Sequence, residues 1–316
     1  MDQGSKIFIA GHRGLVGSAI ARSLEALGYR NLVTRSHAEL DLTRQDQTES
    51  FFERERPEYV FLAAATVGGI GANSSRPSDF LYDNIMIAAN VIRAARLSGV
   101  KKLLNLGSSC IYPKMAPQPL KEEYLLSGPL EPTNEGYAVA KIAAIRMCKH
   151  SNDQYGTNYI SAMPTNLYGI GDNYDPEGSH VMPALIRKFH EAKTSGAKAV
   201  LWGDGSPLRE FLYADDCAEA CVMLMEKCDY SDIGEFINLG SGSELTIREL
   251  ALKVARAVGY EGEIEWDMSR PNGTPRKTMD SSRLFALGWK PRVGLDEGIS
   301  AAYADFLARY ARRSAA

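Results

Sequence analysis

The chain has 316 residues, of which 45% are apolar and 24% are charged, and 36 Lys and Arg stand against 39 Asp and Glu. This balance is typical of a globular protein and excludes the fibrous, disordered and disulfide-scaffold classes. The net charge of −3 gives no reason to expect a nucleic-acid or membrane partner, because such proteins usually carry a basic excess or a clustered basic face.

Short apolar runs alternate with amphipathic stretches up to about residue 165. The runs predict strands at residues 7–10, 32–34, 59–65, 102–106 and 159–163. Between them apolar residues recur at spacings of three and four, which predicts helices, the first of them over residues 15–27. Repeated alternation of strand and helix predicts an α/β fold of the Rossmann type, a doubly wound parallel sheet with helices on both faces.

Three glycines, Gly11, Gly14 and Gly17, follow the first predicted strand and open the first predicted helix. A tight turn there needs a residue without Cβ, and the helix N-terminus supplies N–H groups and a partial positive charge to a pyrophosphate. Glycines at this spacing also occur in incidental turns, but the flanking strand and helix favour dinucleotide binding. The predicted contacts in the turn are Gly11, His12, Arg13, Gly14, Leu15, Val16 and Gly17.

The end of the second strand indicates which dinucleotide binds. In NAD-binding proteins an acid there holds the adenosine ribose hydroxyls. Here the position is Arg35, with Arg13 available from the turn, and guanidinium groups form bidentate bonds to phosphate. We therefore expect NADP(H), although Arg35 can also be a solvated residue at a strand end. Asp41 and Leu42 are expected beside the adenine, with a helix N-cap as the alternative for Asp41.

A phenol and an ammonium, Tyr137 and Lys141, lie four residues apart and share one face if the segment is helical. A nearby Lys⁺ favours the phenolate, so we expect a lowered pKa for Tyr137 and proton exchange with a carbonyl or alcohol. Ser108 and Ser109 follow the strand at 102–106, at the carboxyl edge where ligands bind in open α/β sheets. Ser108 can donate to the same substrate oxygen as Tyr137, or both serines can satisfy local backbone groups.

Beyond residue 166 the pattern loosens into loops rich in Gly, Asp, Asn and Pro, as expected for a smaller second lobe in a chain of this length. Helices are predicted near residues 181–193 and 247–258, and another core strand at 235–239. We expect residues 1–168 to form the NADP-binding Rossmann domain, with segments near 211–240 returning to it. Residues 169–316 are expected to form mainly the loop-rich substrate lobe.

Neither a membrane span nor a disulfide framework is expected. The longest uncharged stretch, residues 59–75, is interrupted by three glycines and is shorter than the roughly 20 apolar residues that cross a bilayer. The N-terminus has no long apolar core of a secretion signal, which predicts a cytoplasmic protein. The cysteines form no CxxC pair, so we expect free thiols and no metal site. They are Cys110, Cys148, Cys217, Cys221 and Cys228.

Taken together, these motifs resemble the extended short-chain dehydrogenase/reductases that act on nucleotide sugars. The likeness covers nearly the whole chain and rests on the glycine turn, residues 108–110, the Tyr137–Lys141 pair and residues 164–169. Within that family, residues 10–14, 108–114 and 179–181 resemble the members that act on GDP-4-keto-6-deoxy-D-mannose. The resemblance implies epimerisation at C3 and C5, followed by reduction at C4 with NADPH, which yields GDP-L-fucose.

Inversion of a carbon needs a base and an acid on opposite faces, and the resemblance assigns these roles to Cys110 and His180. A thiol suits protons alpha to a ketone if nearby positive charge favours the thiolate. An imidazole with a pKa near 6.5 donates at neutral pH. Ser108 and Tyr137 would hold the C4 oxygen in both steps. Without the resemblance, Cys110 is better explained as an ordinary buried thiol and His180 as a loop histidine.

The resemblance also implies contacts along the nicotinamide end of the cofactor, with Lys141 on the ribose. These are Leu106, Gly107, Ser108, Ser109, Lys141, Pro164, Thr165, Asn166, Leu167 and His180. Four contacts are implied for the GDP-sugar, and each taken singly is more often a solvated charge or a core aromatic residue. They are Arg187, Trp202, Arg209 and Lys277. Some relatives carry arginine at His37 and lysine at Arg187, and the first difference weakens the expectation of NADP over NAD.

Two helical stretches, residues 83–98 and 135–152, are rich in apolar and small residues. They can simply pack on the sheet, and the resemblance implies a homodimer that pairs them in a four-helix bundle.

Two other functions share the cofactor motifs. Another NADP-dependent nucleotide-sugar reductase or epimerase would differ at Cys110, His180 and the sugar lobe. A nucleotide-sensing protein without catalysis would commonly lack the tyrosine or the lysine, and this chain has both.

Overall fold

Six parallel strands form the main sheet in the computed structural model, which describes residues 1–176, 178–270 and 272–314. Every pair of neighbouring strands in this sheet is parallel. In spatial order the strands are β2 (Leu32–Val33), β1 (Ile7–Ala10), β3 (Tyr59–Leu62), β4 (Lys102–Leu106), β5 (Tyr159–Pro164) and β9 (Ile237–Leu239). The predicted doubly wound α/β class is confirmed.

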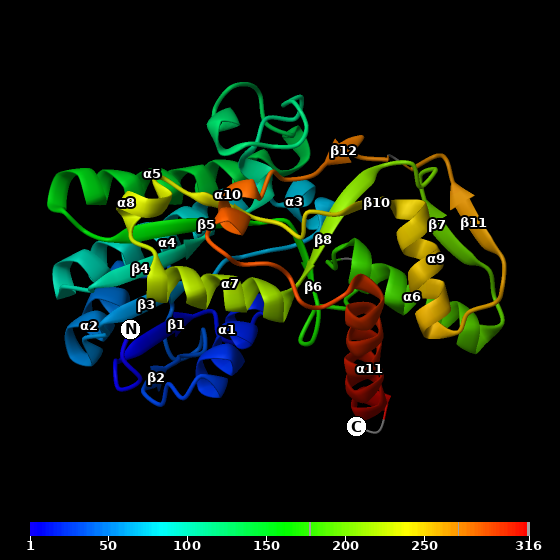
Figure 1. Ribbon diagram of the computed structural model, residues 1–316. Helices are drawn as coiled ribbons and strands as arrows, with labels where there is room; N and C mark the ends of the chain where they lie inside the picture. Colours follow the sequence, from blue (N-terminus) through cyan, green and yellow to red (C-terminus); the bar gives the residue numbers. More distant parts are fainter. Residues whose placement is uncertain (177, 271, 315–316) are drawn as a thin grey trace.

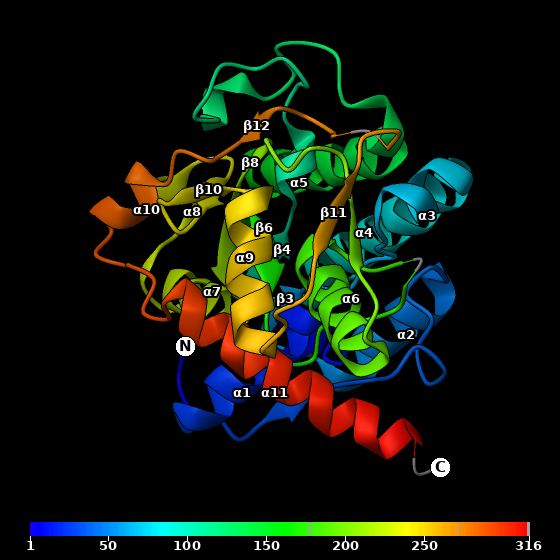
Figure 2. The ribbon, with the colours of Figure 1, turned by 90° about the vertical axis from the view of Figure 1, so that its right-hand side faces the viewer.

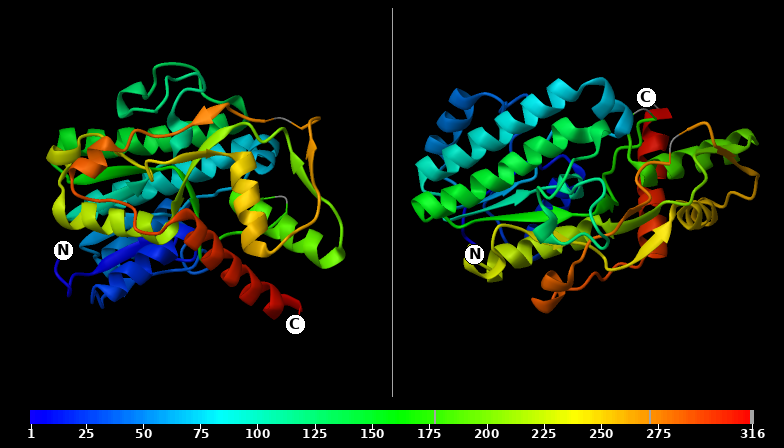
Figure 3. Two further views of the ribbon diagram at one scale, coloured as in Figure 1. Left: turned by 45° about the vertical axis from the view of Figure 1, so that its right-hand side comes forward. Right: turned by 90° about the horizontal axis from the view of Figure 1, so that it is seen from above.

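Helices cover both faces of this sheet (Figure 1). One face packs against α1 (Leu15–Ala26) and α7 (Ala214–Lys227). The other packs against α2 (Gln45–Glu55), α4 (Pro77–Ser98) and α5 (Glu135–Tyr155), and Figure 3 shows α4 and α5 side by side. Successive β1 side chains alternate between the two layers, which is why a strand buried on both faces is an unbroken apolar run.

The predicted strands match the observed ones at residues 7–10 and 102–106, and β5 extends one residue beyond the prediction. The predictions at residues 32–34 and 59–65 are too long. Leu62 pairs with Ala10, which is the last residue of β1 before the glycine turn. The Ala63 nitrogen still donates to the Ala10 carbonyl oxygen, but β1 ends there, so residues 63–65 lie in a loop.

A second lobe is built around β8 (Leu208–Tyr213) and a separate two-stranded sheet (Figure 2). Strands β6 (Asn166–Tyr168), β10 (Glu244–Thr246) and β12 (Arg276–Lys277) pair with β8, and β7 (Ala199–Trp202) pairs with β11 (Ile264–Asp267). Its helices are α6 (Val181–Ser195), α9 (Ile247–Val258) and α11 (Leu295–Ser314). The helices predicted at 181–193 and 247–258 are therefore confirmed, the first with two further residues. A capping box of Thr246 and Glu249 starts α9, and Gly259 ends it in the left-handed conformation.

The chain crosses between the two lobes more than once. Strand β8 of the second lobe leads into α7, which packs on α1, and β9 then adds to the main sheet beside β5. The smaller elements are α3 (Ile70–Ser75), α8 (Tyr230–Ile233), α10 (Ser282–Ala286) and the 3₁₀ segments η1 (Ser109–Ile111), η2 (Glu122–Tyr124) and η3 (Pro132–Asn134). Within the described ranges, none of the helices combines the length and the apolar character that crossing a bilayer requires.

Candidate active site

The three glycines of the first turn have different reasons to be glycine. Gly11 has a φ of +87°, and a Cβ there would lie 2.7 Å from the Ala64 nitrogen. A Cβ on Gly17 would lie 2.1 Å from the Gly11 carbonyl oxygen. Gly14 instead has a φ of −77°, and its Cβ would meet nothing closer than the Gly11 oxygen at 3.4 Å. The fold therefore requires glycine at positions 11 and 17, whereas at Gly14 it does not, and the glycine there leaves a bare surface.

That surface fits the pyrophosphate of a dinucleotide. Gly14 is the N-cap residue of α1, and no side chain caps the helix there. The predicted contacts Leu15, Val16 and Gly17 form the first turn of α1, so their N–H groups lie at the positive end of the helix. A bare, uncapped N-terminus at the carboxyl edge of a parallel sheet is the arrangement that binds phosphate.

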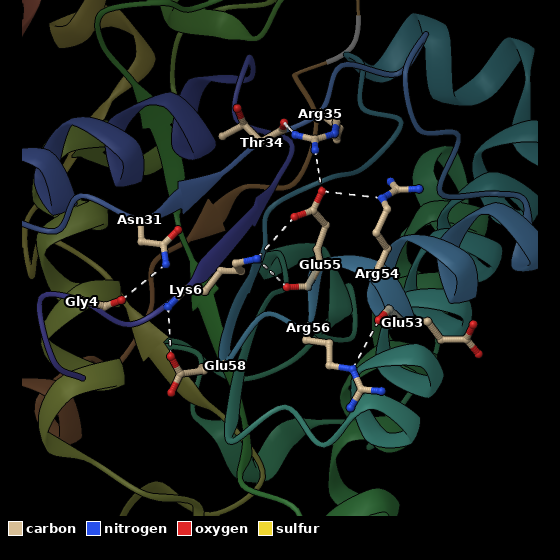
Figure 4. Close-up of polar contacts among 10 residues, drawn as sticks. All are labelled: Gly4, Lys6, Asn31, Thr34, Arg35, Glu53, Arg54, Glu55, Arg56 and Glu58. Carbon is tan, nitrogen blue, oxygen red and sulfur yellow. Dashed lines mark hydrogen bonds and ion pairs between the residues drawn. The ribbon is translucent and has the colours of Figure 1, made fainter.

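Arg35 follows β2 and lies partly exposed beside α2. Its Nη1 donates to the Thr34 carbonyl oxygen and its Nη2 to Glu55 Oε1, both at 2.7 Å (Figure 4). The guanidinium carbon also lies 5.6 Å from the centre of the Phe51 ring. Arg35 is therefore fixed in place and is not a freely solvated strand-end residue.

The turn and the second strand converge near Glu39. Hydrogen bonds from Ser36 lower the pKa of Glu39, and the charges of Arg35 and Arg13 lower it further. Arg13 also lowers the pKa of His12, second to burial. The two predicted phosphate-binding arginines thus act on the same carboxylate from different segments of the chain.

Asp41 is half-buried and Leu42 is buried where the chain continues from the second strand. Asp41 Oδ1 accepts from the nitrogen of Thr43 at 3.0 Å and from its hydroxyl at 2.7 Å, closing a local turn. The N-cap residue of α2 is Arg44, so the N-cap alternative for Asp41 is wrong. Leu42 is buried in the core beneath α2 and α4, and its carbonyl accepts from Asn90.

Tyr137 and Lys141 lie on α5, facing the end of β4. The Lys141 nitrogen donates to the Leu106 carbonyl oxygen at 2.8 Å and lies 5.6 Å from the centre of the Tyr137 ring. The Tyr137 phenol is hydrogen-bonded to Ser108. The predicted serine, tyrosine and lysine therefore meet at the carboxyl edge of the sheet.

The expected lowering of the Tyr137 pKa is wrong for this structure. Burial raises the pKa of Tyr137, the charge of Cys110 adds to this, and the hydrogen bond with Ser108 opposes it. Burial also lowers the pKa of Lys141 to about 8, and its nitrogen is directed at a backbone carbonyl. The phenol is consequently neutral near pH 7, the form that donates a proton.

Cys110 and His180, which are distant in sequence, share a cationic neighbour. Burial raises the pKa of Cys110, while the charges of Lys277 and Lys141 and a hydrogen bond with Ser108 lower it. Burial lowers the pKa of His180, and Lys277 lowers it further. Cys110 lies in η1, and His180 is the N-cap residue of α6. Lys277 therefore lies within reach of both the predicted base and the predicted acid.

The remaining predicted cofactor contacts lie at the ends of β4 and β5, which are neighbours in the sheet. Gly107 follows β4, and a Cβ there would lie 2.0 Å from the Met163 sulfur, so a larger residue would require the Met163 side chain to move. Ser109 is buried in η1. Thr165 and Asn166 both donate to the Glu210 carbonyl oxygen and continue the chain from Pro164 toward Leu167.

The predicted substrate contacts form separate groups. Arg209 and Lys277 are register partners on β8 and β12. Trp202 is 59% exposed at the end of β7, with Lys188 and Arg270 lying 5.4 and 5.1 Å from its ring centre. Arg187 on α6 donates to Glu191 at 2.6 Å and to the Tyr174 carbonyl at 3.0 Å. Contacts among the described residues connect Arg209 with Lys277 but neither of them with Arg187 or Trp202.

Two asparagines near Tyr137 were missed by the sequence analysis. A cavity of about 270 Å³ is bordered by Tyr137, Asn73 and Asn134. The side-chain oxygens of both asparagines are buried without a hydrogen-bond partner. Asn73 Nδ2 donates to the carbonyls of Gly68 and Gly69, which fixes the orientation of the amide. Neither asparagine belongs to a spaced motif, so only the fold brings them to the site.

The glycine turn, the half-buried Ser108–Tyr137 pair with the buried Lys141, and the sheet edge define a dinucleotide-dependent enzyme that works on a carbonyl or alcohol. Among the described residues, no group of three or more His, Cys, Asp or Glu is placed to hold a metal ion.

The chain belongs to the NAD dependent epimerase/dehydratase family, whose family model matches residues 7–240. It is 58% identical over 313 residues to GDP-L-fucose synthase 1 of Arabidopsis thaliana, an alignment that covers 99% of this chain and 96% of that protein. The predicted family resemblance is thereby confirmed.

The fold is also similar to solved structures of related enzymes. A GDP-L-fucose synthetase from Naegleria fowleri bound to NADP superposes with a TM-score of 0.90 at 28% identity, covering 98% of this chain and 96% of that one. A GDP-mannoheptose C4 reductase from Campylobacter jejuni with NADP bound has a TM-score of 0.89 at 40% identity, covering 97% and 99%.

Proposed function

We propose that this protein converts GDP-4-keto-6-deoxy-D-mannose to GDP-L-fucose, by epimerisation at C3 and C5 and then reduction at C4 with NADPH. The names of its relatives and the NADP in similar structures support this. One observation carries the proposal. Cys110 and His180, a base and an acid that reduction alone does not need, share the cationic neighbour Lys277, and the charge of Cys110 also acts on Tyr137.

For the reduction, Ser108 and the neutral Tyr137 hold the C4 oxygen, and Tyr137 donates a proton to it. When bound, NADPH supplies the hydride that C4 receives. Lys141, anchored to the Leu106 carbonyl, would bind the nicotinamide ribose. The bare turn at Gly14 would hold the pyrophosphate, and Arg13 and Arg35 the 2′-phosphate.

For the epimerisation, Cys110 takes a proton from the carbon next to the C4 carbonyl. The enolate oxygen is held by the same two hydroxyls that serve the reduction. His180 returns a proton on the opposite face. Burial keeps Cys110 protonated at rest, so Lys277 and Lys141 ease the ionisation that this step requires.

The GDP moiety would lie across the second lobe. Arg209 and Lys277 on adjacent strands offer two cations to the diphosphate, and Trp202 offers an exposed ring to the guanine. Arg187 is a further cation for this site. This assigns cofactor binding to residues 1–168 with the returning segment 211–240, and substrate binding mainly to 169–316.

We further propose a homodimer formed by α4 and α5 of each copy, working in the cytoplasm. Large apolar side chains are exposed on both helices: Tyr82 and Leu97 on α4, and Val139 and Tyr155 on α5. Exposed apolar residues on two adjacent helices favour a self-complementary interface. The five buried free cysteines suit a reducing compartment. Sedimentation of the native protein at twice the chain mass supports the dimer, and a monomer contradicts it.

The test is to incubate the purified protein with GDP-4-keto-6-deoxy-D-mannose and NADPH in D₂O. We expect consumption of NADPH in step with GDP-L-fucose that carries deuterium at C3 and C5. Cys110→Ser should abolish deuterium incorporation, whereas substitution of Cys148, a buried core cysteine on α5, by serine should not. Reduction without inversion would contradict the roles of Cys110 and His180. No oxidation of NADPH would favour another sugar or a binding protein.

A further inference from the structure

One carboxylate behind the proposed 2′-phosphate site is surrounded by cations and has no role in the reaction described above. Glu55 Oε1 lies 2.7 Å from Arg35 Nη2 and 3.8 Å from Arg54 Nε, and Oε2 lies 3.5 Å from Lys6 Nζ (Figure 4). The Glu55 side chain is 18% exposed. A largely buried carboxylate with three cations is held in one place and neutralised there.

The position of Glu55 is unfavourable without these partners. Glu55 is the last residue of α2, where the negative end of the helix dipole repels an anion. Lys6 offsets this repulsion through two contacts. Its ammonium pairs with the Glu55 carboxylate and also donates to the Glu55 backbone carbonyl at 2.8 Å. Lys6 immediately precedes β1, so the carboxylate is tied to the strand that leads into the glycine turn.

Glu55 and Phe51 together fix the guanidinium of Arg35. They lie four residues apart on one face of α2, one bonded to Nη2 and the other beneath the guanidinium. The Thr34 carbonyl accepts from Nη1. These contacts use two of the five N–H groups of the guanidinium, and the side chain stays 33% exposed. The remaining donors therefore have a fixed direction.

We propose that Glu55 is a specificity-determining positioning residue, which holds Arg35 so that its remaining N–H groups meet the 2′-phosphate of NADPH. This rests on the proposed use of NADPH. Ordering a long side chain before the ligand arrives removes an entropic cost from binding. Repulsion between Glu55 and the phosphate is the smaller effect, because Lys6 and Arg54 neutralise the carboxylate and solvent screens the partly exposed site.

The test measures, by calorimetry, binding of adenosine 2′,5′-bisphosphate and of 5′-AMP, which lacks the 2′-phosphate. Glu55→Ala should weaken binding of the bisphosphate about fivefold, as expected for ordering one flexible side chain, and leave 5′-AMP unchanged. Glu55→Gln, which keeps the size of the side chain, should give a smaller loss. Glu53→Ala on the same helix is the matched control, because its side chain points away from Arg35 (Figure 4). The KM for NADPH should rise, whereas the KM for NADH and kcat should stay unchanged.

Arg35→Ala completes a double-mutant cycle with Glu55→Ala. In its background Glu55→Ala should have no further effect, since the carboxylate would have nothing left to position. Equal weakening of both nucleotides, tighter binding of the bisphosphate, or a full effect without Arg35 would each overturn the proposal. If Arg35→Ala removes the preference for the bisphosphate and Glu55→Ala does not, only the role of Glu55 fails. If the native protein shows no preference at all, the NADPH assignment fails with it.

Discussion

Lys277 illustrates how a single side chain can set the chemistry of two others. Its charge lowers the pKa values of both Cys110 and His180. The sequence analysis placed it only among the substrate contacts. Its strand, β12, has two residues, and its pairing with β8 is a long-range contact that no local pattern reveals. The glycine turn and the Tyr137–Lys141 pair could be predicted because their spacing along the chain is itself the geometry.

We predict that Lys277→Gln shifts the pH profile of deuterium incorporation at C3 and C5. Without the ammonium, the pKa of Cys110 and the pKa of His180 both rise, so both limbs of the profile move to higher pH. Arg209→Gln is the matched control, since it removes the neighbouring diphosphate cation and should raise KM without moving the limbs. An unchanged profile for Lys277→Gln would restrict this lysine to substrate binding.

Substitution of Gly14 should affect ligand binding, whereas substitution of Gly17 should affect the stability of the fold. Gly14→Ala should leave the free energy of unfolding within about 0.5 kcal/mol of the native value, because its Cβ meets only the Gly11 oxygen, at 3.4 Å. It should weaken NADPH binding at least about tenfold, since the methyl group occupies the pyrophosphate surface. Gly17→Ala should instead destabilise the fold by about 1–3 kcal/mol, because its Cβ meets the Gly11 oxygen. Calorimetry and urea unfolding measure the two effects, and equal behaviour of the two variants would refute the distinction.

At the scale of elements, the loop between β6 and α6 is joined to α11 through a buried acid. Burial raises the pKa of Asp172 to about 7, although the Asn173 nitrogen and the charge of Arg309 oppose this. The Asp172 carbonyl accepts from Arg309, and the Gly171 nitrogen donates to Asp305 on the same helix. The sequence predicted α6 from its apolar periodicity. It gave no sign of this contact, because Asp172 resembles any loop aspartate.

The Asp172 contact predicts a pH dependence of stability. The folded-state pKa lies above the unfolded value near 4, so the folded protein binds the proton more tightly and loses stability as pH rises from 4 to 7. Asp172→Asn should remove this loss and raise the free energy of unfolding at pH 8 by about 4 kcal/mol, with little change at pH 4. Urea unfolding at both pH values tests this, with the exposed Asp46→Asn as control. A variant with the native pH slope would be evidence against it.

At the scale of the whole molecule, a buried lysine ties the late part of the chain to the early sheet. Lys102 begins β4, is 4% exposed, and donates to the carbonyls of Leu224, Met225 and Cys228 at the end of α7. The doubly wound class could be predicted from the alternation of strands and helices. The order in which distant segments join could not, because β9 and α7 reach the sheet only through tertiary contacts.

Lys102→Met should lower the free energy of unfolding by about 2–3 kcal/mol, because it leaves carbonyls at a buried helix end without their donor. Lys101→Met is the matched control. Its side chain is 61% exposed and paired with Glu58, so its loss should cost far less stability than the loss of Lys102. Urea unfolding followed by circular dichroism compares the two, and similar losses would mean that the capping contact adds little.

The position of β9 in the sheet also affects how the protein is made. Strand β5 is buried along its whole length, and one of its two edges is covered only when β9 arrives. Residue 237 follows residue 164 by 73 residues, which a ribosome takes roughly 4–15 s to synthesise. During those seconds the nascent chain presents an open apolar strand edge, which invites pairing with other chains. Translation speed between these strands, and chaperone capture there, should therefore govern the yield of folded protein.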